Sequence, residues 1–233
     1  MIKLDHLLYC YKHLKMQFNF HINKAEKVAI LGPSGAGKST LLNLIAGFQY
    51  PEKGEIWLNN KNHTTTPPIK RPVTILFQEN NLFSHLTVWQ NIALGISANL
   101  RLKKPQHHLI NQIIEQVSLE NCITSLPSQI SGGQRQRTAL ARCLIRQKPI
   151  LLLDEAFSAF DPVLRNEMLI LLKQVCNERQ LTLLIISHSL EDVSQIASRS
   201  IVIVNGRITY NDQLGKLIDG SIPDSILFGI SNS

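Results

Sequence analysis

The 233-residue sequence predicts an α/β fold with a largely parallel sheet, and three observations carry this prediction. Short apolar segments alternate with segments of helical periodicity along most of the chain, which is the pattern of strands joined by crossover helices. One apolar segment, residues 28–31, runs into a glycine-rich loop and then into a helical segment over 40–46. Another, residues 150–153, is continuously apolar and ends in two acidic residues, as a buried parallel strand does.

The glycine-rich loop fits the pattern G-x-x-x-x-G-K-[ST] of the phosphate-binding loop in nucleoside triphosphatases. Its glycines let several backbone N–H groups point at one phosphate, and the following helix adds its positive N-terminal end. In this pattern Lys38 neutralises the β- and γ-phosphates and Ser39 binds Mg²⁺. A glycine-rich turn that binds nothing is the alternative, but strand, loop, Lys-Ser pair and helix occur together here. The predicted nucleotide-binding residues are Gly32, Pro33, Ser34, Gly35, Ala36, Gly37, Lys38, Ser39 and Thr40.

The remaining elements follow from periodicity and turn chemistry. Alternating apolar and polar residues before the loop predict strands joined by a turn at 23–26, and the Thr- and Pro-rich segment 64–68 predicts a loop. Asn205-Gly206 between two apolar runs is a strong hairpin signal. Strands are predicted at 2–8, 16–22, 27–31, 54–58, 73–77, 150–153, 181–187, 201–204 and 207–210, and helices at 40–46, 162–179 and 190–197.

The chain is expected to form a single domain over residues 1–233. From residue 88 the pattern becomes helical and more polar, which predicts a helical lobe at 88–146 inserted between strands of the main sheet. Residues 1–87 and 147–233 then form the core of the domain.

Composition narrows the class of protein. The apolar runs are far shorter than the ~18 residues of a membrane span, and the N-terminus has no apolar signal region, so we expect a cytosolic chain. Four cysteines lie far apart without a C-x-x-C pair, which favours reduced thiols over a metal site or disulfides. The net charge of +7 comes without a dense basic run that contains aromatic residues, so we expect no nucleic-acid partner.

The acidic end of the strand at 150–153 is the second candidate part of the site. In a parallel sheet this strand would bring Asp154 and Glu155 to the edge where the phosphate-binding loop lies. Asp154 is then placed to bind Mg²⁺, and Glu155 to orient or deprotonate the attacking water. A solvated turn is the alternative reading, and four apolar residues leading into the two acids disfavour it.

A second glycine-containing helix start follows at residues 131–137. Ser131 can cap this helix, and its free N–H groups suit a phosphate. The sequence Ser131-Gly132-Gly133-Gln134 matches the signature motif of the ATP-binding cassette (ABC) family, and with the two earlier motifs the chain resembles the nucleotide-binding domain of ABC transporters. The resemblance covers nearly the whole chain and implies a P-loop NTPase fold with an antiparallel β subdomain and an inserted helical subdomain.

Further residues match the family in the expected order. Gln78 matches the glutamine loop, Asp161 lies in the loop after the second acid motif, and His188 matches the switch histidine. Tyr11 lies where the family places an aromatic ring on adenine, with Tyr9 as the second choice.

The resemblance implies a mechanism in which two copies dimerise head to tail around two ATP molecules. Each ATP would contact the phosphate-binding loop of one copy and the signature residues Ser131, Gly132, Gly133 and Gln134 of the other. Glu155, His188 and Gln78 would be the catalytic residues, Asp161 would make contacts across the dimer, and Mg²⁺ would be bound by Ser39, Gln78 and Asp154.

Residues 82–88, after the glutamine loop, resemble those of bacterial importers, and residues 32–48, 63–68, 77–85 and 187–192 are most similar to the ATP-binding subunits of thiamine importers. This implies two transmembrane permease subunits or halves, a periplasmic thiamine-binding protein, and a peripheral location on the cytoplasmic face of the inner membrane. Two alternatives are an importer of another small solute (a polyamine, sulfate or iron) and a soluble ABC protein without a transport role.

Overall fold

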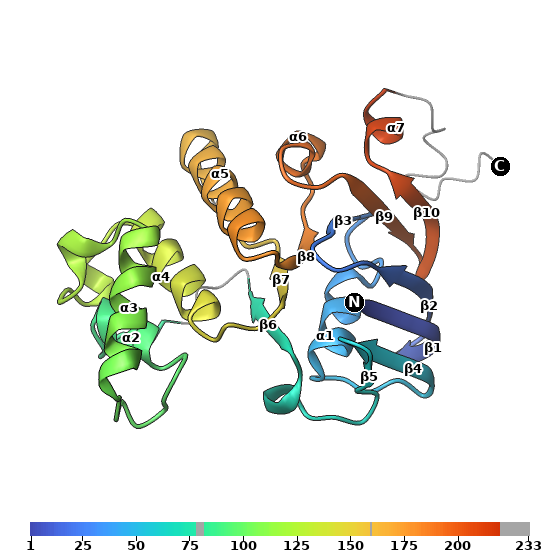
Figure 1. Cartoon of the computed structure of the whole chain (residues 1–233). Coiled ribbons are helices and arrows are strands. Elements are labelled where there is room, and N and C mark those ends of the chain that lie inside the picture. Colours follow the sequence, from blue (N-terminus) through green and yellow to red (C-terminus); the bar gives the residue numbers. More distant parts are fainter. Residues whose placement is uncertain (78–81, 159, 220–233) are drawn as a thin grey trace.

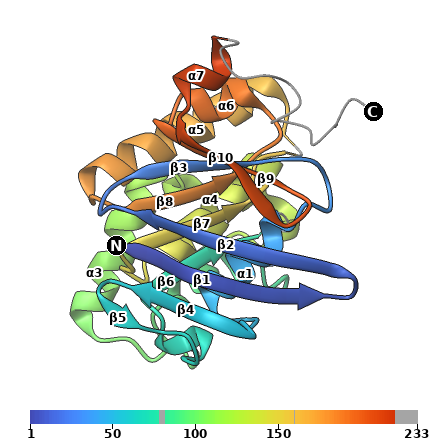
Figure 2. The ribbon, with the colours of Figure 1, turned by 90° about the vertical axis from the view of Figure 1, so that its right-hand side faces the viewer.

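The computed structural model describes residues 1–77, 82–158 and 160–219. Its strands form one ten-stranded sheet in the order β5-β4-β1-β2-β10-β9-β3-β8-β7-β6 (Figures 1 and 2). The strands are β1 (Ile2–Tyr11), β2 (Leu14–Ile22), β3 (Lys27–Leu31), β4 (Lys53–Leu58), β5 (Lys61–Asn62), β6 (Val73–Leu76), β7 (Ile150–Asp154), β8 (Thr182–Ile186), β9 (Arg199–Val204) and β10 (Arg207–Gln213).

The helices carry the other layers of the fold. They are α1 (Lys38–Ala46), α2 (Val88–Ala93), α3 (Lys104–Gln116), α4 (Gly132–Leu144), α5 (Pro162–Glu178), α6 (Leu190–Ser194) and α7 (Gly215–Ile218), with short 3-10 helices at Pro68–Lys70, Glu120–Cys122 and Pro127–Gln129. No helix in the described part of the chain is long and apolar enough to span a membrane.

The sheet has a parallel half and an antiparallel half. Strands β9, β3, β8, β7 and β6 run parallel, and most of their residues are buried on both faces. Strands β1, β2, β4 and β5 are antiparallel, and β2 alternates buried and exposed residues because one face is solvated. β10 joins the halves: it pairs antiparallel with β9 and contacts β2 through Arg207 and Gln17. The predicted fold class is thereby confirmed.

Side chains on the parallel strands alternate between two hydrophobic cores. In β7, Leu151 and Leu153 pack with helices α2 to α6, whereas Ile150 and Leu152 pack with α1 and the antiparallel strands. Helix α1 therefore covers one face of the parallel strands, while α4 and α5 pack with the core of the other face. Figure 1 shows α2, α3 and α4 grouped together at one end of the molecule.

The observed elements differ from the predicted ones mainly at their ends. Strand β1 continues to Tyr11 because β2 pairs with it up to Leu14, and helix α6 ends at Ser194 rather than at residue 197. The boundaries of the helical lobe at 88 and 146 stay a prediction.

Candidate nucleotide-binding site

The phosphate-binding loop lies in a backbone conformation that only glycine adopts easily at three positions. Gly32, Gly35 and Gly37 have φ values of 138°, 77° and 104°. A Cβ atom on Gly32 would lie 2.0 Å from the Ile203 carbonyl oxygen in β9, and one on Gly37 would lie 2.9 Å from the Met16 sulfur. The loop is thus packed directly against β9 and β2, which fixes its shape.

Lys38 extends its ammonium group back into this loop. Its Nζ donates hydrogen bonds to the carbonyl oxygens of Gly32 at 2.8 Å and Pro33 at 2.9 Å. Burial lowers the pKa of Lys38, while the nearby carboxyl groups of Glu155 and Asp154 oppose that shift. The loop therefore holds a desolvated cation in place, and an entering phosphate would supply the opposite charge.

Ser39 and Asp154 bring two oxygen donors together. The Ser39 hydroxyl donates to the Asp154 carboxylate at 3.0 Å, which joins the start of α1 to the end of β7. Burial raises the pKa of Asp154, and the charge of Glu155 adds to this, while Ser39 and Lys38 oppose it. A hydroxyl and a carboxylate are ligands that Mg²⁺ prefers, so this donor set fits the predicted metal site. Gln78, the third predicted ligand, lies outside the described residues.

Glu155 and His188 form a close pair at the carboxyl edge of the sheet. The His188 Nε2 atom lies 2.7 Å from Glu155 Oε1. The two residues meet because β7 and β8 are neighbours in register, with Asp154 opposite Ile186. Glu155 has a φ of 49°, a strained value for a non-glycine residue, where the chain turns sharply after β7.

The signature residues form the start of α4. Ser131 is the N-cap: its hydroxyl accepts from the Gln134 N–H at 3.2 Å, and the Gln134 side chain accepts from the Ser131 N–H at 2.9 Å. This capping box uses the Gln134 amide within the chain. A Cβ on Gly132 would make only an ordinary contact, 3.8 Å from the Arg135 guanidinium, whereas a Cβ on Gly133 would lie 2.8 Å from the Leu164 side chain. The N-terminus of α4 is thus preformed, with Gly133 packed against α5.

Asp161 and Tyr11, two further residues predicted from the sequence, lie at the ends of secondary-structure elements. Asp161 caps α5, and its carboxylate accepts from the Leu164 N–H at 3.0 Å. Tyr11 lies at the end of β1 and is 49% exposed, and the Lys12 ammonium lies 5.6 Å from the centroid of its ring. The same hairpin carries Met16, which packs against Gly37 of the phosphate-binding loop.

Comparison with known proteins assigns the chain to a family. A sequence model of the family described as ABC transporter matches residues 16–158. The chain belongs to the ABC transporter family. The resemblance predicted from the phosphate-binding loop, the acidic strand end and the signature residues is therefore confirmed.

Two curated relatives match this ABC chain over nearly its full length. The chain is 61% identical to the thiamine import ATP-binding protein ThiQ of Photorhabdus laumondii, covering 99% of this chain and 98% of the relative. It is 58% identical to the protein of the same name from Yersinia pseudotuberculosis, covering 100% and 99%. The expected likeness to ATP-binding subunits of thiamine importers is thus confirmed.

A solved ABC structure has the same fold. It is the dimeric post-hydrolysis state of the ATP-binding cassette MJ0796 bound to ADP and Pi, with a TM-score of 0.77 and 29% sequence identity. The match covers 92% of this chain and 99% of that one. The present chain is accordingly an ATP-binding cassette.

Sequence reasoning missed a buried contact between the signature helix and the loop after Glu155. Gln136 is 1% exposed, and its side-chain amide donates to the Ala156 carbonyl oxygen at 2.7 Å. The available signal was spacing, because Gln136 lies three residues after Gly133 and four before Leu140, on the buried face of α4. A polar residue at such a position needs a partner, and the structure identifies it.

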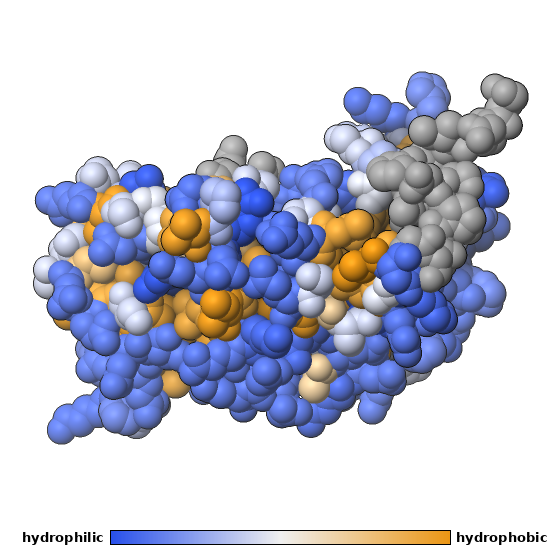
Figure 3. All heavy atoms as spheres, turned by 90° about the horizontal axis from the view of Figure 1, so that it is seen from above, coloured by the Kyte–Doolittle hydropathy of each residue, from blue (hydrophilic) through white to orange (hydrophobic). Residues whose placement is uncertain are grey.

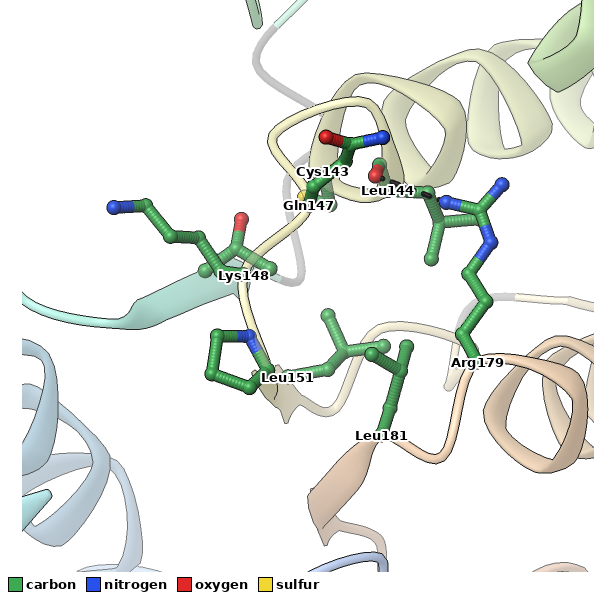
Figure 4. Close-up of a pocket in the computed structure, with 9 residues that line it drawn as sticks. Cys143, Leu144, Gln147, Lys148, Leu151, Arg179 and Leu181 are labelled. Atoms are coloured by element: carbon green, nitrogen blue, oxygen red, sulfur yellow. Dashed lines mark hydrogen bonds between the residues drawn. The ribbon is translucent and has the colours of Figure 1, made fainter. Parts of the chain in front are cut away.

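A separate cavity of about 350 Å³ lies away from this site (Figure 4). Lys148 and Pro149 line it just before β7 begins, whereas the candidate nucleotide-binding site lies at the other end of that strand. Arg179 borders the cavity and donates to the Leu144 carbonyl oxygen at 3.2 Å (Figure 4). The cavity therefore lies at the opposite edge of the sheet from the candidate nucleotide-binding site.

Proposed function

We propose that this chain is the ATP-hydrolysing subunit of a bacterial importer and couples ATP binding and hydrolysis to thiamine uptake across the inner membrane. The observation that carries the ATPase role is the Glu155–His188 pair at 2.7 Å, on strand ends next to the buried Lys38 and the Ser39–Asp154 pair. The thiamine assignment rests on the names of full-length relatives at 61% and 58% identity.

The geometry supports a division of roles among the site residues. Lys38 and the backbone N–H groups of the phosphate-binding loop would bind and neutralise the phosphates. Ser39 and Asp154, with Gln78, would hold Mg²⁺, which when bound neutralises charge on the phosphate oxygens. Glu155 would orient the attacking water and accept its proton, and His188 would hold the Glu155 carboxylate and the γ-phosphate in position.

A head-to-tail homodimer would complete each site. In one chain the phosphate-binding loop starts α1 on one face of the parallel strands, while Ser131 starts α4, which packs with the core of the other face. Val163 is 71% exposed beside Asp161, and Leu190 is 38% exposed two residues after His188. Figure 3, a view from above onto the side where α5 and α6 lie, shows apolar residues gathered in a band. Such exposed apolar surface is typical of association sites.

Replacing Ser131 by arginine is expected to block closure of this dimer while ATP binding to the monomer persists. The larger cationic side chain would occupy the N-terminus of α4, where the partner's γ-phosphate would lie. Size-exclusion chromatography with ATP, on a background that does not hydrolyse it, measures closure. Asn111→Arg, which adds the same charge on the exposed side of α3, is the control. Closed dimers of the Ser131 variant would contradict the shared-site geometry.

An apolar groove of about 670 Å³ supports docking on two transmembrane permease subunits or halves. Phe48, Phe77 and Phe83 line it, and the rings of Phe48 and Phe77 are 5.9 Å apart. Buried Asn91 holds the adjoining segment: it accepts from the Phe83 N–H at 2.9 Å and donates to the Phe83 carbonyl oxygen at 3.1 Å. The chain would then lie peripherally on the cytoplasmic face of the inner membrane, and a periplasmic thiamine-binding protein would deliver the substrate.

Uptake of labelled thiamine tests the whole proposal. In cells whose own copy is replaced by the Glu155→Gln variant, thiamine uptake is expected to collapse while spermidine and sulfate uptake persist. Normal thiamine uptake would overturn the substrate assignment and favour an importer of another solute. Recovery of the chain with membranes separates an importer from a soluble ABC protein.

A further inference from the structure

We propose that Arg165 is a positioning residue that ties the loop after Glu155 to the helix after His188 and thereby sets the geometry of the Glu155–His188 pair. This inference rests on the proposed hydrolysis at Glu155. It assigns a role to an arginine that matches none of the motifs in the sequence.

Arg165 makes two different contacts with the two ends of its guanidinium group. One terminal nitrogen donates to the Asp192 carboxylate at 3.3 Å, and the other donates to the Phe160 carbonyl oxygen at 2.8 Å. Its Nε atom is buried and has no hydrogen-bond partner among the described residues. The guanidinium thus bridges the two segments.

The Phe160 contact fixes the segment that follows Glu155. Phe160 lies just before Asp161, which caps α5, and Arg165 sits in the first turn of that helix. The Arg165 guanidinium therefore folds back over the start of its own helix and holds the last carbonyl of the loop. Because Glu155 lies at the other end of this loop in a strained conformation, its orientation depends on where the loop is anchored.

The Asp192 contact fixes the segment that follows His188. Helix α6 begins two residues after His188, and its N-cap Ser189 accepts from the Asp192 N–H at 3.1 Å. Asp192 and His188 therefore belong to one short segment, joined through the N-cap of α6. Asp192 also lines a small cavity of about 30 Å³ together with Glu155 and His188, so it lies close to the pair.

The chemistry of arginine suits this role. Its planar guanidinium presents several N–H groups in a fixed arrangement and can bridge a carboxylate and a carbonyl at once, whereas a lysine ammonium is a flexible point charge. The Arg165 and Asp192 side chains are 25% and 20% exposed. A pair that is partly exposed contributes little to stability, so its main effect here is geometric.

Steady-state ATPase kinetics on the purified full-length chain with Mg²⁺ and ATP test this role. Arg165→Gln and Asp192→Asn are each expected to lower kcat about tenfold, with KM for ATP within about twofold of wild type, because nucleotide binding does not use this pair. The double variant is expected to lose no more than either single variant, since both remove the same bridge. Arg165→Lys should give an intermediate kcat.

The control is Asp212→Asn, which breaks the exposed Asp212–Lys216 ion pair of 2.6 Å outside the site and should leave kcat unchanged. Wild-type kcat in both Arg165→Gln and Asp192→Asn would overturn the inference. So would a fall in melting temperature together with a matching rise in KM, because that pattern means a structural role. Glu155→Gln, measured alongside, separates failure of this inference from failure of the proposed function. If that variant keeps normal turnover, the proposed hydrolysis at Glu155 itself fails.

Discussion

ATP hydrolysis by the purified chain is expected to fall by a factor of about 10²–10⁴ when Glu155 is replaced by glutamine, the range typical for loss of a general base. The substitution keeps the size and shape of the side chain and the contact with His188, but it removes the carboxylate that accepts the proton from water. ATP binding should persist, because the contacts of Lys38 and Ser39 are untouched. The result would be a long-lived dimer with bound ATP.

Phosphate release gives the rate, and equilibrium titration with ATP gives the affinity. Glu115→Gln, an exposed residue on α3, is the matched control and should retain normal turnover. Normal turnover by the Glu155 variant would remove this residue from its proposed role.

Lys38→Ala is expected to lower ATP affinity by about two orders of magnitude, because hydrogen bonds to charged groups contribute roughly 1.5–3 kcal/mol each. Lys38 is 5% exposed, and its ammonium already lies among the carbonyl oxygens of the phosphate-binding loop. Its removal leaves the phosphate charge unpaired in a desolvated site. Isothermal titration calorimetry measures the loss of affinity directly.

Lys104→Ala, which removes an exposed lysine at the start of α3, is the control for net charge. Unchanged ATP affinity in the Lys38 variant would count against the phosphate-binding loop. The two main variants separate two steps of the reaction, because Lys38→Ala is expected to lose binding and Glu155→Gln to lose hydrolysis alone.

Local signals made much of the site predictable from sequence. The loop from Gly32 to Ser39 is contiguous, and each of its residue types follows from a backbone or charge requirement. The apolar strand before Asp154 predicted a position at the carboxyl edge of the sheet, and the structure places Asp154 against Ser39. Gln78 lies outside the described residues, and the catalytic roles remain proposals.

Contacts between distant segments were not predictable in the same way. The Gln136–Ala156 contact spans 20 positions and the Arg165–Asp192 contact spans 27, and neither pair forms a motif. Their partners depend on which helix packs on which face of the sheet. A polar residue on an apolar helix face signals that a partner is needed, but it does not identify that partner.

The sequence by itself determined the family and the phosphate-binding loop, and it predicted the residues that would bind phosphate, metal and water, because these depend on side-chain chemistry and short spacing. The tertiary structure alone decided how these residues are held. The order of the strands brought His188 Nε2 to 2.7 Å from Glu155 Oε1. Packing of the helices brought Gln136 to the Ala156 carbonyl oxygen and Arg165 to the Phe160 carbonyl oxygen, both in the loop after Glu155. The physical reason is that catalytic geometry is set by contacts between segments far apart in the chain, and each such contact exists only once the sheet and its covering helices have formed.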